Sequence, residues 1–193
     1  MRNIVVSMNV TADGFMSGLN GELNWHFNFW DDEMCECVCE QLYHADALLL
    51  GKNTYNALAR YWPYKVIDQS MPRGDIILAD MMNRHQKIVY SHMLTLLPWA
   101  NSSLLRGDLK QRIEELKQTD GRNIITYGSG QLIASLLKED LIDRFELWTH
   151  PVRIRSGIPL FRSRHAPPGM LLSNTRKLRS GVEILYYERN YKI

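Results

Sequence analysis

Two short polar segments have the residue types needed to bind phosphate groups. Gly128-Ser129-Gly130 follows an apolar run and precedes an apolar-periodic one, which predicts a strand, a tight turn and a helix. Free N–H groups at a helix start, beside unhindered glycine backbone, bind anions. The segment has neither the GxGxxG nor the Walker pattern, so it predicts neither a Rossmann fingerprint nor an ATPase. A tight turn without a ligand is the alternative.

Gly51-Lys52-Asn53-Thr54 has the same placement, between a predicted strand and a predicted helix. Lys52 supplies a positive charge, and Asn53 or Thr54 can cap the helix. A helix cap with no ligand is again the alternative. Two such loops at one edge of a sheet would bind a ligand with separated phosphates. Together they predict a dinucleotide site.

The elements that position these loops follow from apolar periodicity. In the first part of the chain the sequence predicts a buried strand over 4–8, a turn over 11–14, a first helix over 31–43, a strand over 47–50, and a helix that stops at Pro63. Asp31 or Asp32 can cap the helix over 31–43.

The later elements predict the fold class. Strands are expected over 87–91 and 123–126, the second followed by a helix, and then over 145–149, 170–178 and 182–189. Alternating strands and helices indicate an α/β fold with three layers. A mainly parallel central sheet would carry helices on both faces and an antiparallel C-terminal hairpin. We expect a single domain over residues 1–193.

Composition excludes several classes of partner. A net charge of +2, from 23 basic and 21 acidic residues, is too small to favour nucleic acid or an anionic membrane. There is no membrane-length apolar run and no signal-peptide pattern, so we expect a cytoplasmic protein. The spacing of Cys35, Cys37 and Cys39 predicts free thiols, and no histidine has metal-ligand spacing. We therefore expect no metal site.

Several segments, taken in order, resemble the dihydrofolate-reductase-like superfamily. More specifically, they resemble the branch that contains the C-terminal reductase domain of bifunctional riboflavin-biosynthesis proteins. The similar segments cover residues 6–15, 45–55, 87–91, 99–102, 128–130 and 151–161. The resemblance implies a reductase that uses NADPH.

The resemblance also assigns cofactor contacts residue by residue. It places the nicotinamide near Ala12 and Gly14, and the adenosine ribose and its phosphate near Ser91 and His92. His92 stands where the family carries an arginine, and Arg155 stands where it carries a glycine. The remaining implied contacts come from the two glycine-containing loops: Gly51, Lys52, Asn53, Thr54, Gly128, Ser129, Gly130, Gln131 and Leu132.

Substrate residues are expected between residues 20 and 31. Residues 20–25 resemble the active-site loop of dihydrofolate reductases, and Asp31 would face the substrate pocket as the catalytic carboxylate. An ionised Asp31 could accept two N–H bonds from an aminopyrimidine edge, and the alternative is a helix N-cap. Trp25 would bind the heterocycle, with nearby aromatic rings as its walls, or these rings belong to the core or a dimer contact.

Three functions follow. The first is NADPH-dependent hydride transfer to a small pterin-like or aminopyrimidine heterocycle. The second narrows this to the 5-amino-6-(5-phosphoribosylamino)uracil reductase of riboflavin biosynthesis, and the third is a non-catalytic nucleotide-binding protein.

The resemblance implies a homodimer, for which aromatic residues near Trp99 and Tyr187 offer a surface. Arg153, Arg155, Arg162 and Arg164 could meet a substrate phosphate, or form a solvated face.

Overall fold

The apolar, β-branched run at the N-terminus forms strand β1 (Ile4–Thr11), which contributes to two units of the chain. The first unit comprises Met1–Val5 and Cys35–Ile142, and the second comprises Val6–Met34 and Asp143–Ile193. The computed structural model describes residues 1–65, 73–161, 167 and 169–189. Arg162 and Arg164 of the predicted basic cluster lie outside the described residues.

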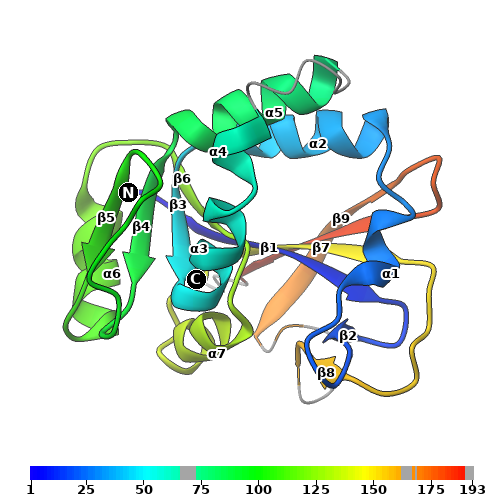
Figure 1. Cartoon of the computed structure of the whole chain (residues 1–193). Coiled ribbons are helices and arrows are strands. Elements are labelled where there is room, and N and C mark those ends of the chain that lie inside the picture. Colours follow the sequence, from blue (N-terminus) through cyan, green and yellow to red (C-terminus); the bar gives the residue numbers. More distant parts are fainter. Residues whose placement is uncertain (66–72, 162–166, 168, 190–193) are drawn as a thin grey trace. The chain divides into compact units, whose positions relative to one another are not determined.

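The first unit contains the predicted parallel sheet (Figure 1), with strand order β5-β4-β3-β6-β1. Strand β3 pairs in parallel with β4 and with β6, and β4 pairs in parallel with β5. The carboxyl ends of these four strands therefore meet at one edge of the sheet. The strands are β3 (Ala45–Gly51), β4 (Gln86–Tyr90), β5 (Ser102–Leu105) and β6 (Asn123–Thr126).

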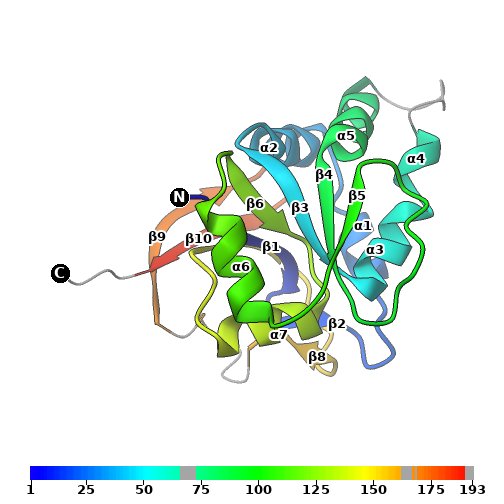
Figure 2. The same cartoon turned by 90° about the vertical axis from the view of Figure 1, so that its left-hand side faces the viewer.

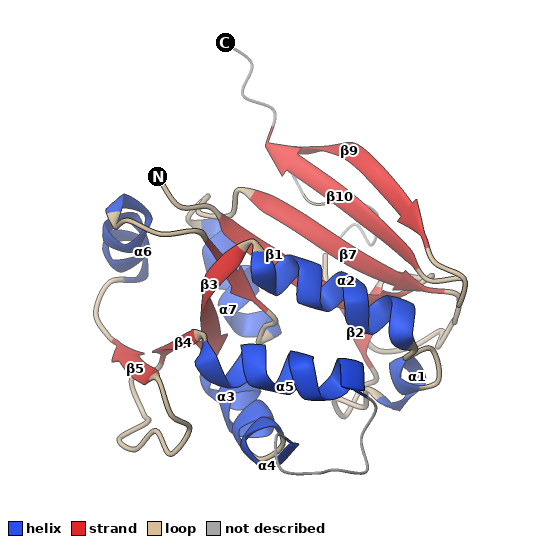
Figure 3. Ribbon diagram, turned by 90° about the horizontal axis from the view of Figure 1, so that it is seen from above, coloured by secondary structure: helices blue, strands red, loops and turns tan. Residues whose placement is uncertain are grey.

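Helices cover both faces of this sheet, as the three-layer prediction requires. Helices α2 and α5 lie on one face, and α6 and α7 lie on the other (Figures 2 and 3). Alternate strand residues such as Leu48 and Leu50 pack into a buried cluster with Leu42 of α2 and Leu78 of α5. The helices are α2 (Asp32–Tyr43), α3 (Lys52–Ala59), α4 (Trp62–Lys65), α5 (Arg73–Arg84), α6 (Leu109–Gln118) and α7 (Gly130–Lys138).

The prediction that the helix after β3 stops at Pro63 is wrong. Helix α3 ends at Ala59, and Pro63 is the second residue of the short helix α4. The first turn of a helix tolerates proline because its N–H groups have no partner within the helix. The sequence patterns did not predict helices α5 and α6 or strand β5.

The second unit contains the rest of β1 and the antiparallel C-terminal strands, in the order β1-β7-β10-β9. Strand β10 pairs antiparallel with both β7 and β9, so the predicted hairpin is confirmed (Figure 3). The short helix α1 precedes α2, so the helix over 31–43 is not the first. The elements are β2 (Phe15–Ser17), α1 (Asn24–Phe27), β7 (Arg144–His150), β8 (Ile158–Pro159), β9 (Met170–Lys177) and β10 (Glu183–Arg189).

Two of the aromatic residues expected at an interface are buried in their own units. Trp99 is 2% exposed and Tyr187 is 8% exposed. The Trp99 indole N–H donates to Asn83 Oδ1 at 2.6 Å, and Lys87 Nζ lies 4.6 Å from the centre of the Trp99 ring. These side chains offer no surface to a second copy, and a homodimer stays a prediction.

Two further expectations concern the cysteines and the helices. Cys35, Cys37 and Cys39 are thiols, as predicted. Among the described residues, every helix is too short or too polar to cross a membrane.

Candidate active site

The two glycine-containing loops lie next to each other in the first unit. The Gly51 N–H donates to the Gly128 carbonyl oxygen at 3.1 Å, so the carboxyl ends of β3 and β6 are joined. Helices α3 and α7 start there, with Gly51 and Ser129 as their N-cap residues. Gly51 has no side chain, and the Ser129 side chain makes no hydrogen bond to a backbone N–H of its helix. Both helix starts therefore present backbone donors to the same edge of the sheet.

Ser129 leaves little room for a side chain at Gly51. A Cβ atom there would lie 2.6 Å from Ser129 Oγ and 3.2 Å from the Ser129 nitrogen. Gly128 has a φ of 113°, which only glycine adopts without strain. These glycines let two helix N-termini converge, which fits a pyrophosphate group. On each helix the first turn carries the other predicted contacts: Lys52, Asn53 and Thr54 on α3, and Gly130, Gln131 and Leu132 on α7.

A third loop, at the end of β4, lies beside the first. Ser91 Oγ accepts hydrogen bonds from the Met93 and Leu94 N–H groups at 3.2 and 3.1 Å, so it shapes the turn. His92 is exposed, and its Nε2 lies 3.2 Å from the Tyr90 hydroxyl. Lys52 Nζ lies 3.7 Å from Met93 Sδ, which joins this loop to the start of α3. The predicted cofactor residues of the first unit therefore gather at one edge.

Arg106 adds a positive charge that the sequence reading does not identify. It directly follows β5, and the Ser91 N–H donates to the Leu105 carbonyl oxygen at 3.3 Å. Its Nη2 donates to the Leu94 carbonyl oxygen at 2.7 Å, in the loop that carries Ser91 and His92. The residue is exposed. Arg106 thus places a guanidinium group against the loop that contains His92, the position at which the family carries an arginine.

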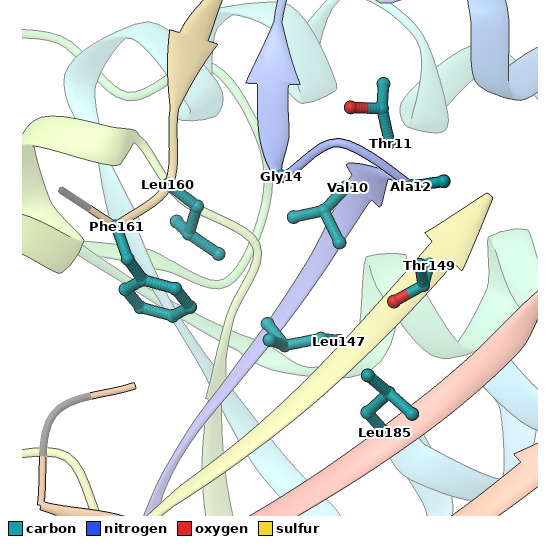
Figure 4. Close-up of a pocket in the computed structure, with 9 residues that line it drawn as sticks. All are labelled: Val10, Thr11, Ala12, Gly14, Leu147, Thr149, Leu160, Phe161 and Leu185. Atoms are coloured by element: carbon teal, nitrogen blue, oxygen red, sulfur yellow. The ribbon is translucent and has the colours of Figure 1, made fainter. Parts of the chain in front are cut away.

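The second unit has a pocket of about 250 Å³ at the ends of β1 and β7 (Figure 4). Apart from Thr11 and Thr149, the residues that line it are of apolar types. Ala12 and Gly14, the two residues expected near the nicotinamide, both line it. The full lining is Val10, Thr11, Ala12, Gly14, Leu147, Thr149, Leu160, Phe161 and Leu185. This volume suits a single planar ring rather than a whole dinucleotide.

Asp13 holds the turn that forms one wall of this pocket. Its carboxylate accepts hydrogen bonds from Thr11 Oγ1 at 2.6 Å and from the Arg155 N–H at 2.8 Å. Burial acts to raise the pKa of Asp13, but these hydrogen bonds outweigh it, so the pKa lies below the ordinary value. Arg155 has a φ of 63° and an exposed side chain. It therefore keeps a backbone conformation that favours glycine, without filling the loop.

The predicted catalytic residue Asp31 is the N-terminal cap of α2. Its Oδ1 accepts a hydrogen bond from the Met34 N–H at 2.8 Å, and its side chain is half-buried. Asp32 is exposed. The cap uses one carboxylate oxygen, so capping and substrate binding by Asp31 are compatible.

Trp25, the predicted substrate-binding residue, belongs to a ring cluster around His150. The Trp25 and His150 ring centres are 5.2 Å apart, and the Phe29 and His150 ring centres are 5.4 Å apart. His150 is 0% exposed, and its Nε2 lies 2.8 Å from Asn9 Oδ1. Burial and the nearby His26 lower the pKa of His150 to about 4, so its ring is neutral at pH 7. The sequence reading does not identify His150, because a single histidine in a strand has no distinguishing spacing.

Comparison with known proteins identifies the family. The sequence profile of the RibD C-terminal domain matches residues 2–181. The chain belongs to the RibD C-terminal domain family. This family is reductase-like, in agreement with the resemblance found in the sequence.

This chain is similar to two proteins of Bacillus subtilis (strain 168), and both are named as uncharacterised. YyaP is 28% identical over 190 residues, which cover 98% of this chain and 96% of YyaP. YwjB is 25% identical over 185 residues, which cover 96% of this chain and 97% of YwjB. Neither relative assigns a substrate.

Solved structures confirm the fold of this chain. A protein of Shewanella sp. PV-4 named for riboflavin biosynthesis has a TM-score of 0.72 and 20% identity, over 97% of this chain and 99% of that one. A diaminohydroxyphosphoribosylaminopyrimidine deaminase/5-amino-6-(5-phosphoribosylamino)uracil reductase of Thermotoga maritima has a TM-score of 0.66 and 15% identity. That alignment covers 98% of this chain and 57% of the Thermotoga protein.

Proposed function

We propose that this protein is an NADPH-dependent reductase that transfers a hydride to a small aminopyrimidine or pterin-like heterocycle. The main support is the pair of helix starts at Gly51 and Ser129, which lie so close that a Cβ atom on Gly51 would be 2.6 Å from Ser129 Oγ. Such a pair suits the two phosphates of a dinucleotide. Membership of the reductase-like RibD C-terminal domain family supports the same choice.

Bound NADPH would supply the hydride, and the chain would bind and orient the reactants. The N–H groups at the starts of α3 and α7 would bind the pyrophosphate, with Lys52 offsetting its charge. Ala12 and Gly14 line a pocket whose volume of about 250 Å³ would accommodate a nicotinamide ring. The free oxygen of the Asp31 cap would accept N–H bonds from the substrate and fix its orientation.

The experiment that tests this function is a titration with NADPH and, separately, NADH. Binding is followed by nucleotide fluorescence and by the rise in unfolding temperature that a native-state ligand produces. We expect NADPH to bind with a micromolar Kd and to be oxidised when an aminopyrimidine or pterin substrate is present. Binding of neither nucleotide would refute the reductase proposal.

The same assay separates the two other functions. The similarity to the Thermotoga deaminase/reductase favours 5-amino-6-(5-phosphoribosylamino)uracil as a specific substrate. Oxidation of NADPH with this compound would establish the narrower activity. Binding of NADPH without turnover of any heterocycle would indicate a non-catalytic nucleotide-binding protein instead.

Arg106 is expected to distinguish NADPH from NADH. Its guanidinium lies by the loop of Ser91 and His92, where the resemblance places the adenosine phosphate. Arg106→Gln removes a charged hydrogen-bond donor, which is worth about 1.5–3 kcal/mol. NADPH affinity should fall roughly tenfold to a hundredfold while NADH affinity stays the same. Titration calorimetry with both nucleotides measures this difference.

Arg112→Gln is the matched control, because Arg112 is also exposed but pairs with Glu115 at 2.7 Å on α6. It should leave both affinities unchanged. An equal loss of NADPH and NADH affinity in the Arg106 variant would show that Arg106 does not recognise the adenosine phosphate.

A further inference from the structure

Two buried polar atoms of the ring cluster have no hydrogen-bond partner among the described residues. They are Nδ1 of His150 and Nε1 of Trp25. The two rings are in edge contact, with an interplanar angle of 77°. A buried polar group without a partner costs about 1–3 kcal/mol. Two such groups in one cluster indicate that something outside the described chain satisfies them.

The hydrogen-bond roles of these atoms follow from their neighbours. Asn9 Oδ1 is an acceptor, so His150 Nε2, at 2.8 Å from it, carries the ring proton. In a neutral ring this leaves Nδ1 as an acceptor. The indole Nε1 of Trp25 is a donor only. The cluster therefore offers one acceptor and one donor, both uncharged, in neighbouring rings.

A lactam edge has the complementary groups, a ring N–H beside a carbonyl oxygen. We propose that His150 and Trp25 bind the lactam edge of the substrate heterocycle, with the ring N–H donating to His150 Nδ1 and the carbonyl accepting from Trp25 Nε1. Uracils and pterins both have this edge. The inference rests on the proposed function, because it assigns the binding groups of that substrate. The His150–Trp25 pair would favour ligands with an uncharged edge. A charged edge would lose its hydration on binding, and neither ring supplies an opposite charge.

Aromatic walls and a weakly held helix suit the entry of a planar ligand. The rings of Phe29 and His26 also contact His150, with centres 5.4 and 6.1 Å away. Helix α1 carries Trp25 but has only four residues, no buried residue and no side-chain cap. Its Phe27 is 65% exposed. A small displacement of α1 is therefore inexpensive and would open the cluster to a ring.

The test uses 5,6-diaminouracil and its 1,3-dimethyl counterpart, which has no ring N–H. Calorimetry gives the affinity of each compound, and ¹H–¹⁵N spectra follow the indole N–H signals and the His150 ring nitrogens. We expect the diaminouracil to bind, to move the Trp25 indole and His150 Nδ1 signals, and to lose about tenfold in affinity in Trp25→Phe. The dimethyl compound should bind at least about tenfold more weakly to the native protein.

Trp25→Phe keeps the ring packing and removes the donor, so the test does not depend on whether a His150 variant folds. Trp30→Phe is the control, because Trp30 is 39% exposed and should leave the affinity unchanged. Equal affinity in native protein and Trp25→Phe, or equal binding of both compounds, would overturn the inference. Binding of neither compound would also overturn it and would leave a trapped water as the partner of the two atoms.

An NADPH titration of the same samples separates this inference from the proposed function. If NADPH binds and the diaminouracil signals do not move, the lactam site is wrong and the cofactor site stands. If the diaminouracil binds through Trp25 and NADPH does not bind, the lactam site stands and the reductase proposal fails.

Discussion

Ser129→Asp should abolish tight NADPH binding while making the free protein more stable. Ser129 is the N-cap of α7 and its side chain makes no capping bond. Aspartate is a strong N-cap, and its charge at a helix N-terminus adds about 0.3–1 kcal/mol. The same carboxylate would face the pyrophosphate, where two charges about 4 Å apart repel by roughly 4 kcal/mol at an effective dielectric of 20. NADPH affinity should fall about a hundredfold or more.

Ser129→Asn is the matched control, because asparagine caps helices as well as aspartate but carries no charge. Urea unfolding should show that both variants equal or exceed the native protein in stability. Calorimetry should show near-native NADPH affinity for asparagine and a loss only for aspartate. Equal affinities in the two variants would mean that the start of α7 does not bind a phosphate.

Acid should destabilise the second unit through His150. The pKa of this ring is lowered from an ordinary 6.5 to about 4, so between these values the unfolded chain binds a proton that the folded chain does not. The contribution of His150 to the free energy of unfolding is therefore fully present above about pH 6.5 and is lost as the pH falls toward 4. At 1.36 kcal/mol per pKa unit, the loss from this group is at most about 3 kcal/mol. Burial also lowers the pKa of His26, which acts in the same direction.

Urea unfolding between pH 7 and pH 4.5 measures this loss. His150→Gln should be less stable at pH 7 but should show a shallower fall below pH 6.5. His92→Gln is the control, because His92 is exposed and its removal should leave the native pH profile. If the free energy of unfolding of the His150 variant fell as steeply with pH as that of the native protein, the acid sensitivity would not come from His150.

The sequence predicts the strands and the main helices because their apolar periodicity is strong. The parallel strands β3, β4 and β6 and the antiparallel β7, β9 and β10 all lie where the pattern places them. Helix α6 also carries a recognisable signal, since the Gln111 N–H donates to Asp108 Oδ1 and Leu109 and Ile113 are buried. The end of α3 was not predictable from Pro63, because a proline also suits the first turn of the next helix.

The sheet edge with the two glycine-containing loops was more predictable than Arg106 and His150, the two residues that we propose contact the ligands beside it. Gly51 is the last residue of β3, and Gly128 lies two residues after the end of β6, so their position at a sheet edge comes from local sequence. Arg106 and His150 become relevant only through strand pairing. Arg106 reaches the edge because β5 lies beside β4, and His150 meets Asn9 across two strands far apart in sequence. No local pattern carries this information.

The division of the second unit into two distant segments has a consequence for synthesis of the chain. Val6–Met34 leaves the ribosome before its partner segment, which begins at Asp143, after all of Cys35–Ile142. At roughly 5 to 20 residues per second, the first segment waits on the order of ten seconds. During that time the edge of β1 that pairs with β7 has no partner strand. A nascent chain stalled before Asp143 should therefore expose this strand to chaperones, and one released after Arg189 should not.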